Sequence, residues 1–203
     1  MASISVEKLL RKKFKVIELQ NEFQELIGNP ECAGSFIIYG PSANGKTTFA
    51  VQLLKEFCKS KKVGYNSIEE KAKFSFQNAL KRGNILSVKG KLKIWISLSV
   101  EELTEELIKP KSPDVVFIDS VQYLRMTQRS VNQLTLFEYK NLINRFPNKL
   151  FIFISHAKKG EPKGSLAESI LHDADVGIYI KDFIATPTKS RYGGKTIYEI
   201  LKN

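Results

Sequence analysis

The chain has 203 residues, of which 42% are hydrophobic and 26% are charged, the composition of an ordinary soluble globular protein. It is long enough to bury one core, and no apolar run approaches the ~20 residues of a membrane-spanning helix. The formal net charge of +11 favours a nucleic-acid partner, although solvated lysine-rich helix faces would give the same excess.

The N-terminus and the cysteines indicate where the protein resides. Residues 1–20 mix charged and apolar side chains and lack the continuous apolar segment of a signal peptide. Cys32 and Cys58 form neither a CxxC pair nor a zinc set. We therefore expect structural thiols in a reducing compartment, and a cytoplasmic protein.

In chain order, the first predicted element is helical. Val6, Leu9, Leu10, Phe14 and Ile17 recur every three or four residues. The spacing continues on a shifted face up to residue 26, so the phase slips near residue 17. A proline at position 30 ends the segment, and we predict an N-terminal helical segment (1–30) before a single core domain (31–203).

The core alternates short apolar strands with helices. Strands are predicted at 36–39, 63–67, 94–98, 115–118, 150–155 and 176–180, and helices at 46–59, 70–81, 100–108 and 131–145. The tail, 183–186 and 196–201, is predicted to be an antiparallel pair around "SRYGGK". This alternation predicts an α/β fold with a mostly parallel sheet covered on both faces.

A phosphate-binding motif connects the first predicted strand to its helix. The segment "SFIIYGPSANGKTTFAVQLL" contains Gly-x-x-x-x-Gly-Lys-Thr. Two glycines let successive N–H groups surround one concavity at a helix N-terminus. Lys46 is expected to contact the β- and γ-phosphates, and the Thr47 hydroxyl to ligate Mg²⁺. The predicted ATP-binding residues are Gly40, Pro41, Ser42, Ala43, Asn44, Gly45, Lys46, Thr47 and Thr48.

Carboxylates follow two other predicted strands. In "SPDVVFIDS" four apolar residues place Asp119 at the C-terminal end of a buried strand, where α/β sheets bind ligands. With the phosphate loop upstream, Asp119 is a candidate ligand of the same magnesium ion. Glu69 and Glu70 follow the strand after the loop's helix, and either carboxylate would polarise an attacking water. The alternative is that both only favour the first turn of the next helix.

The ordered motifs resemble the RecA superfamily, and most closely the ATPase core of RadA/Sms proteins, with DnaB-type helicase cores next. The resemblance rests on the phosphate loop, "NSIEEK", "PDVVFIDSVQYL", "FIFISHAKKGEPKG" and "TKSRYGGKTIYEI". It covers residue 35 to the C-terminus. The RadA zinc module, the protease-like domain and a helicase N-terminal domain are missing, and the segment after Asp119 is short for a first DNA-binding loop.

The resemblance implies roles for further residues. It nominates Glu69 as the catalytic carboxylate, beside Lys46 and Asp119, and His156 as a sensor of the γ-phosphate. "KSRYG" resembles the Lys-Asn-Arg-Phe-Gly motif of RadA, which implies that Lys189 or Arg191 reaches the nucleotide of a neighbouring subunit. A basic turn that uses two glycines is the alternative.

Two predicted loops carry basic residues towards the nucleotide edge. Arg125 and Arg129 follow the Asp119 strand, and Lys158, Lys159 and Lys163 follow the His156 strand with two glycines. A flexible lysine-rich loop suits contacts with DNA phosphates, although a merely solvated loop has the same composition.

We therefore predict a Mg²⁺-dependent, DNA-stimulated ATPase that acts on single-stranded DNA in recombination, repair or replication. The expected partners are further copies of the chain, in a ring or filament, and a helicase or recombinase. No membrane role is expected. The alternative is a helicase-loader-like or KaiC-like regulator whose partner is a protein. A small-molecule kinase ranks last, because no arginine-rich lid lies between residues 59 and 90.

Overall fold

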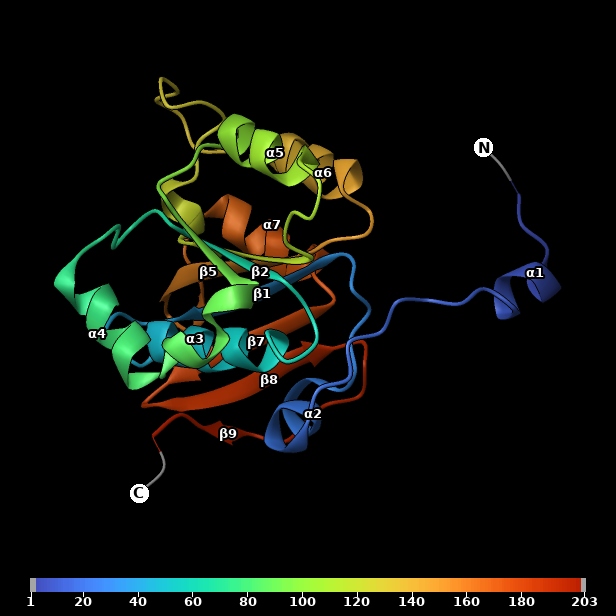
Figure 1. The fold of residues 1–203 in the computed structure, drawn as a ribbon, viewed down its shortest axis with the longest axis horizontal. Coiled ribbons are helices and arrows are strands. Elements are labelled where there is room, and N and C mark those ends of the chain that lie inside the picture. Colours follow the sequence, from blue (N-terminus) through green and yellow to red (C-terminus); the bar gives the residue numbers. More distant parts are fainter. Residues whose placement is uncertain (1–2, 202–203) are drawn as a thin grey trace.

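The computed structural model describes residues 3–201, and one sheet runs through this part of the chain (Figure 1). Its strands lie in the order β3-β2-β4-β5-β1-β7-β8-β9, and β6 pairs with β5. The strands are β1 (Ser35–Gly40), β2 (Val63–Ser67), β3 (Leu92–Ile96), β4 (Val115–Asp119), β5 (Leu150–Lys158), β6 (Glu161–Pro162), β7 (Val176–Lys181), β8 (Ile184–Ser190) and β9 (Tyr198–Glu199).

Helices cover both faces of the sheet (Figure 1). They are α1 (Val6–Leu10), α2 (Asn21–Ile27), α3 (Lys46–Phe57), α4 (Phe74–Arg82), α5 (Val100–Ile108), α6 (Leu136–Arg145) and α7 (Ser165–Asp173), with 3₁₀ turns η1 (Ile85–Lys91) and η2 (Val121–Tyr123). Alternate β1 residues face opposite layers: Phe36 packs with α2, α3 and α4, whereas Ile37 packs with α5, α6 and α7.

The central strands have apolar sequences because they are buried on both faces of the sheet. Every residue of β1, β2 and β4 is buried, and β3, β2, β4, β5, β1 and β7 all pair in parallel. A strand covered on both faces must be apolar on both, which explains uninterrupted runs such as "VVFI". The antiparallel pairs β7–β8 and β8–β9 form one edge of the sheet. The predicted fold class is confirmed.

Within 3–201, no helix is both long and apolar enough to cross a bilayer.

The N-terminal segment differs from the prediction. Residues 5–27 contain only α1 and α2, separated by a non-helical stretch. Ile17 and Leu19 are buried while Glu18 between them is exposed, so the chain enters the core in an extended, period-2 conformation. The predicted phase slip marks this change. All described residues of α1 are exposed, and the helix lies apart from the body (Figure 1).

Some element bounds also differ from the prediction. The helix predicted at 70–81 begins at Phe74, because Lys71 has a positive φ of 54° that delays it. The helix predicted from 131 begins at Leu136, since Thr135 and Glu138 form a capping box there. The strand predicted at 94–98 is β3, two residues earlier. Helix α7, which lies where a loop was predicted, was not predicted, and neither were the turns η1 and η2 and strand β6.

Candidate functional site

The phosphate loop joins β1 to α3. Gly45 precedes the helix with φ +97°, and the nearby Ala43 also has a positive φ of 61°. A Cβ on Gly40 would lie 2.0 Å from the Ile180 carbonyl oxygen, so only glycine fits beside β7. A loop with left-handed residues directly before a helix N-terminus is the backbone arrangement that binds phosphate through main-chain N–H groups.

Two side chains of the loop make hydrogen bonds within the protein. Lys46 Nζ donates to the Pro41 carbonyl oxygen at 2.7 Å, across the mouth of the loop. Burial lowers the pKa of Lys46, and the nearby carboxylates of Asp119 and Glu69 partly offset this shift by raising it. Thr47 Oγ1 donates to Glu70 Oε1 at 3.2 Å. An ammonium has three donors, so this half-buried group keeps donors with which it can bind an anion.

Asp119 ends β4 and is buried. The Tyr65 hydroxyl donates to its Oδ2 at 2.5 Å. Burial raises the pKa of Asp119 to about 6, to which Glu69 and Glu70 add, while Tyr65 and Lys46 act in the other direction. Because burial makes the ionised form of this carboxyl group unfavourable, a cation bound next to it would stabilise that form strongly. Its environment therefore suits a metal-bound nucleotide.

The carboxyl ends of neighbouring strands bring Glu69 and His156 together. Ser67 pairs in register with Asp119, and His156 pairs with Gly40. Glu69 N–H donates to the Asp119 carbonyl at 3.0 Å, and Glu69 Oε1 lies 3.0 Å from His156 Nε2. Glu70 turns elsewhere, to Thr47 and to Ser75. The two glutamates therefore occupy distinct environments, and Glu69 is the one beside the histidine.

Gln122 was missed by the sequence analysis. Its Nε2 donates to Ser155 Oγ at 2.7 Å and to the Lys163 carbonyl at 2.8 Å, and its Oε1 accepts from His156 N–H at 3.4 Å. The residue thus ties the end of β4 to His156 and to the basic hairpin. Its only sequence signal is its position three residues after Asp119.

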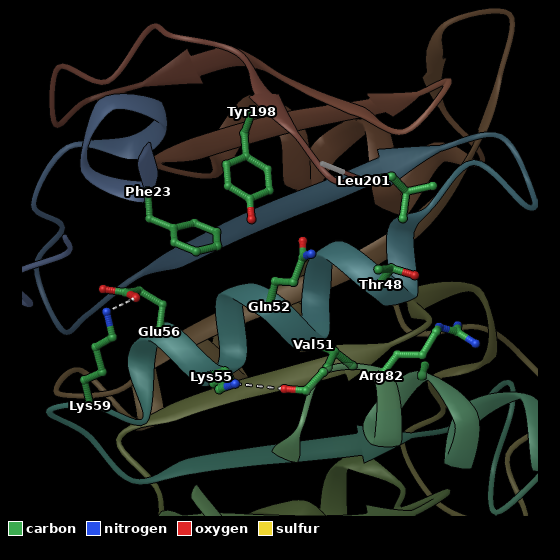
Figure 2. Close-up of a pocket in the computed structure, with 12 residues that line it drawn as sticks. Phe23, Thr48, Val51, Gln52, Lys55, Glu56, Lys59, Arg82, Tyr198 and Leu201 are labelled. Carbon is green, nitrogen blue, oxygen red and sulfur yellow. Dashed lines mark hydrogen bonds and ion pairs between the residues drawn. The ribbon is translucent and has the colours of Figure 1, made fainter. Parts of the chain in front are cut away.

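Two cavities meet at the loop. The smaller, about 230 Å³, is lined by loop residues together with Glu70 and Phe183. The larger, about 530 Å³, runs along α3 and shares Thr48 with the smaller one. Figure 2 shows Thr48, Arg82 and Leu201 towards one end of it and Phe23 towards the other. Gln52 Oε1 is buried there without a partner among the described residues. Together the cavities offer a polar and a more apolar compartment.

The donor set fits magnesium held jointly with a nucleotide. In the described chain, no group of three or more His, Cys, Asp or Glu side chains is arranged to hold a metal alone. Magnesium in nucleotide sites needs only one or two protein oxygens, because phosphates and water complete its shell. Thr47 Oγ1 and the Asp119 carboxylate are oxygens of this kind.

Comparison with known proteins supports the fold. No family model and no curated protein sequence matches the chain. Among solved structures, the ATPase domain of G40P has a TM-score of 0.62 and 16% identity, over 87% of this chain and 84% of that one. FlaH, a flagellar accessory protein of Methanocaldococcus jannaschii, has a TM-score of 0.62 and 17% identity, over 92% of each chain. The chain has a RecA-like P-loop fold.

In this RecA-like fold, Lys189 and Arg191 lie far from the phosphate loop of their own chain. Ser190 pairs with Val176, at the amino end of β7, whereas the loop lies at the carboxyl ends. Lys189 Nζ donates to the His172 carbonyl at 2.8 Å, and Arg191 lies 3.4 Å from Asp175. The structure therefore does not bring this pair to its own nucleotide site.

The predicted DNA-binding residues lie on the loop edge. Arg125 is half-buried and donates to the carbonyls of Gln122 and Leu124, while Arg129 is exposed. Lys158, Lys159 and Lys163 are exposed, but they lie on a β-hairpin formed by β5 and β6, with positive φ at Lys159 and Gly160. The expected flexible loop is instead an ordered hairpin with a type I′-like turn.

Proposed function

We propose that the protein is a RecA-like ATPase that binds Mg-ATP and couples its hydrolysis to single-stranded DNA, in recombination, repair or replication. One observation carries the proposal: the phosphate loop, Lys46, Asp119 and the Glu69–His156 pair converge at one sheet edge. A phosphate-binding nest beside a buried carboxylate and a second, freer carboxylate is the arrangement that phosphoryl transfer to water requires.

The two cavities suggest how the nucleotide lies. The triphosphate would occupy the smaller cavity, where loop N–H groups and Lys46 balance its charge. The base and ribose would enter the larger cavity beyond Thr48, beside Val51 and Leu201. Gln52 Oε1 would there find the hydrogen-bond donor that it lacks. This compartment combines apolar side chains with polar and charged ones, so it can hold both a base and a ribose.

Each residue then has a role in hydrolysis. Thr47 and Asp119 would hold Mg²⁺, which neutralises charge on the phosphates when bound. Glu69 accepts a proton from the attacking water, and His156 holds the Glu69 carboxylate at 3.0 Å. Tyr65 fixes the rotamer of Asp119 through its hydrogen bond. Side chains of this protein would thus hold the metal ion, position the carboxylates and remove a proton from water.

Coupling to DNA is assigned to the hairpin of β5 and β6. His156 touches Glu69 through its side chain, while its carbonyl accepts from Lys163 N–H at 2.8 Å. Gln122 bridges the same two residues. A change at the γ-phosphate would therefore move the hairpin that carries three exposed lysines towards DNA phosphates.

Assembly into a ring or filament would complete the site. Lys189 and Arg191 reach a nucleotide only if a neighbouring copy presents them, because their own loop lies at the other sheet edge. The exposed α1 arm is consistent with such contacts: Val6 and Leu10 are 75% and 80% exposed. Isolated apolar residues are common on surfaces, but a basic arm away from the body that also exposes several apolar side chains favours a partner.

The alternative function, a regulator of another protein, is favoured by two observations. The similarity to FlaH, a flagellar accessory protein, is as high as the similarity to the G40P ATPase domain. In addition, a cavity of about 540 Å³ between α4, η1 and β3 is lined by Leu80, Leu86, Ile94 and their neighbours. An apolar groove of this kind suits a protein helix.

The distinguishing experiment measures ATP turnover with and without single-stranded DNA, and the mass of the species formed with Mg-ATP. We expect DNA to stimulate turnover and the mass to exceed one chain. Replacing Lys158, Lys159 and Lys163 by Gln should abolish the stimulation and leave basal turnover unchanged, because these lysines do not touch the nucleotide site. If the unmodified protein hydrolysed ATP at the same rate with and without single-stranded DNA, the result would instead support the alternative function as a regulator of another protein.

A further inference from the structure

A lysine-lined cavity lies at the sheet edge opposite the phosphate loop. It has a volume of about 300 Å³ and is formed where β2 and β3 begin and where α5 leads into β4. The side chains that give it its charge are those of Lys62, Lys91, Lys93, Lys109, Lys111 and Glu106. Five ammonium groups and one carboxylate therefore surround one concave site.

Three separate segments supply these lysines: "KSKK" (59–62), "KGKLK" (89–93) and "KPK" (109–111). The first and third are connections between elements, whereas the second spans the end of η1 and the start of β3, and none lies in the β5–β6 hairpin or in the loop after β4. Their convergence results from the sheet order, because β3, β2 and β4 are neighbours and begin at the same edge. A solvated basic helix face would not bring three separate segments around one hollow.

Contacts within the cavity hold the ammonium groups in place. Glu106 pairs with both Lys93 and Lys109 and accepts from the Trp95 indole at 3.2 Å, and these contacts lower its pKa to about 2. Lys91 Nζ donates to the Lys59 carbonyl at 2.7 Å. An ammonium has three donors, so a lysine with one internal partner still has donors for a ligand.

We propose that this cavity binds the phosphate backbone of a nucleic acid strand, at a site separate from the nucleotide-edge hairpin. Clustered ammonium groups around a hollow attract phosphates without reading sequence. A membrane surface is disfavoured: among the residues that line the cavity, Val63 and Pro113 are buried and Leu92 is half-buried, which leaves the small ring of Pro110 as the one exposed apolar side chain, without the large apolar groups that insert into a bilayer. This site does not depend on ATP hydrolysis.

The test measures binding of a labelled oligothymidylate of about twenty nucleotides without ATP, between about 50 and about 200 mM salt. The variant replaces Lys62, Lys91 and Lys111 by Gln, the three lysines that do not pair with Glu106. We expect weaker binding and a salt slope lower by about 2, because each single-strand phosphate contact contributes about 0.7. The matched control replaces three exposed lysines elsewhere, Lys8, Lys13 and Lys195.

A second variant keeps the proposal testable if the triple variant fails to fold. Glu106→Gln removes the one carboxylate lining the cavity, so binding should strengthen several-fold and the salt slope should steepen. An unchanged slope in both variants, or an equal loss in the matched control, would overturn the proposal. So would a triple variant that loses binding to anionic phospholipid vesicles while its oligonucleotide binding stays intact.

The hairpin variant keeps this proposal distinct from the proposed function. Replacing Lys158, Lys159 and Lys163 by Gln should leave ATP-independent binding largely intact while removing DNA stimulation of turnover. If that hairpin variant instead abolished all oligonucleotide binding, the cavity would not be a site of its own.

Discussion

Replacing Glu69 by Gln is expected to reduce ATP hydrolysis by about 100- to 10,000-fold, the usual contribution of a general base. Glutamine is isosteric and keeps the hydrogen bond to His156, but it cannot accept a proton from water. Binding of Mg-ATP should change little, because Glu69 is not assigned to the nucleotide itself. Single-turnover hydrolysis and equilibrium binding of a fluorescent ATP analogue measure the two quantities separately.

Glu70→Gln is the matched control, since it makes the same change one residue away. Glu70 Oε1 accepts from Thr47 and Oε2 accepts from Ser75; in glutamine the amide oxygen keeps the first hydrogen bond, and the amide NH2 can donate to the Ser75 hydroxyl instead. Turnover in this control should stay within about tenfold of the unmodified protein, because no proton transfer is assigned to Glu70. A Glu70 variant that is inactive while the Glu69 variant turns over normally would reverse the two assignments.

Replacing Asp119 by Asn is expected to abolish Mg-dependent hydrolysis and to stabilise the nucleotide-free protein at neutral pH. A carboxyl that ionises at about 6 instead of 3.8 destabilises the folded state once it is ionised. The cost approaches about 3 kcal/mol above pH 6, taken as an order of magnitude. Asparagine removes it and still accepts from Tyr65.

The sign of this effect gives a pH test. Below about pH 3 the carboxyl is protonated in both the folded and the unfolded state, so the two proteins should have similar unfolding free energies. The difference should grow as pH rises from about 3 to about 6 and then level off. Urea unfolding across this range measures it, with Asp182→Asn, an exposed change, as control. An Asp119→Asn variant that is less stable than the unmodified protein at neutral pH would contradict this account.

Local patterns predicted much of the fold. The loop between Gly40 and Thr47 lies between a strand and a helix as expected, because its geometry depends on residues adjacent in the chain. Asp119 ends a buried strand for the same reason, since four preceding apolar residues fill both faces of the sheet. Both features are encoded within about ten residues.

Contacts between distant segments were not predictable in this way. Tyr65 meets Asp119 across 54 positions of sequence, and Gln122 meets Ser155 across 33. Such pairs depend on the strand order and register, which no local pattern specifies. The convergence of three lysine-rich segments was missed for the same reason.

The N-terminal segment shows the limit of periodicity. Val6 and Leu10 have helical spacing, but a short amphipathic helix is stable only when its apolar face is covered. Nothing in the described part of the chain covers α1, so the helix extends over only five residues. Ile17 and Leu19 enter the core as extended chain instead.

The central claim is that a nucleoside triphosphate lies between the phosphate loop and Asp119. The most direct measurement is the calorimetric affinity for Mg-ATP of the unmodified protein and of Lys46→Ala, with Lys140→Ala as a surface control. We expect the control to bind normally and Lys46→Ala to bind at least about tenfold more weakly, since hydrogen bonds to charged groups contribute about 1.5–3 kcal/mol. Equal affinity and equal hydrolysis in Lys46→Ala would contradict the account.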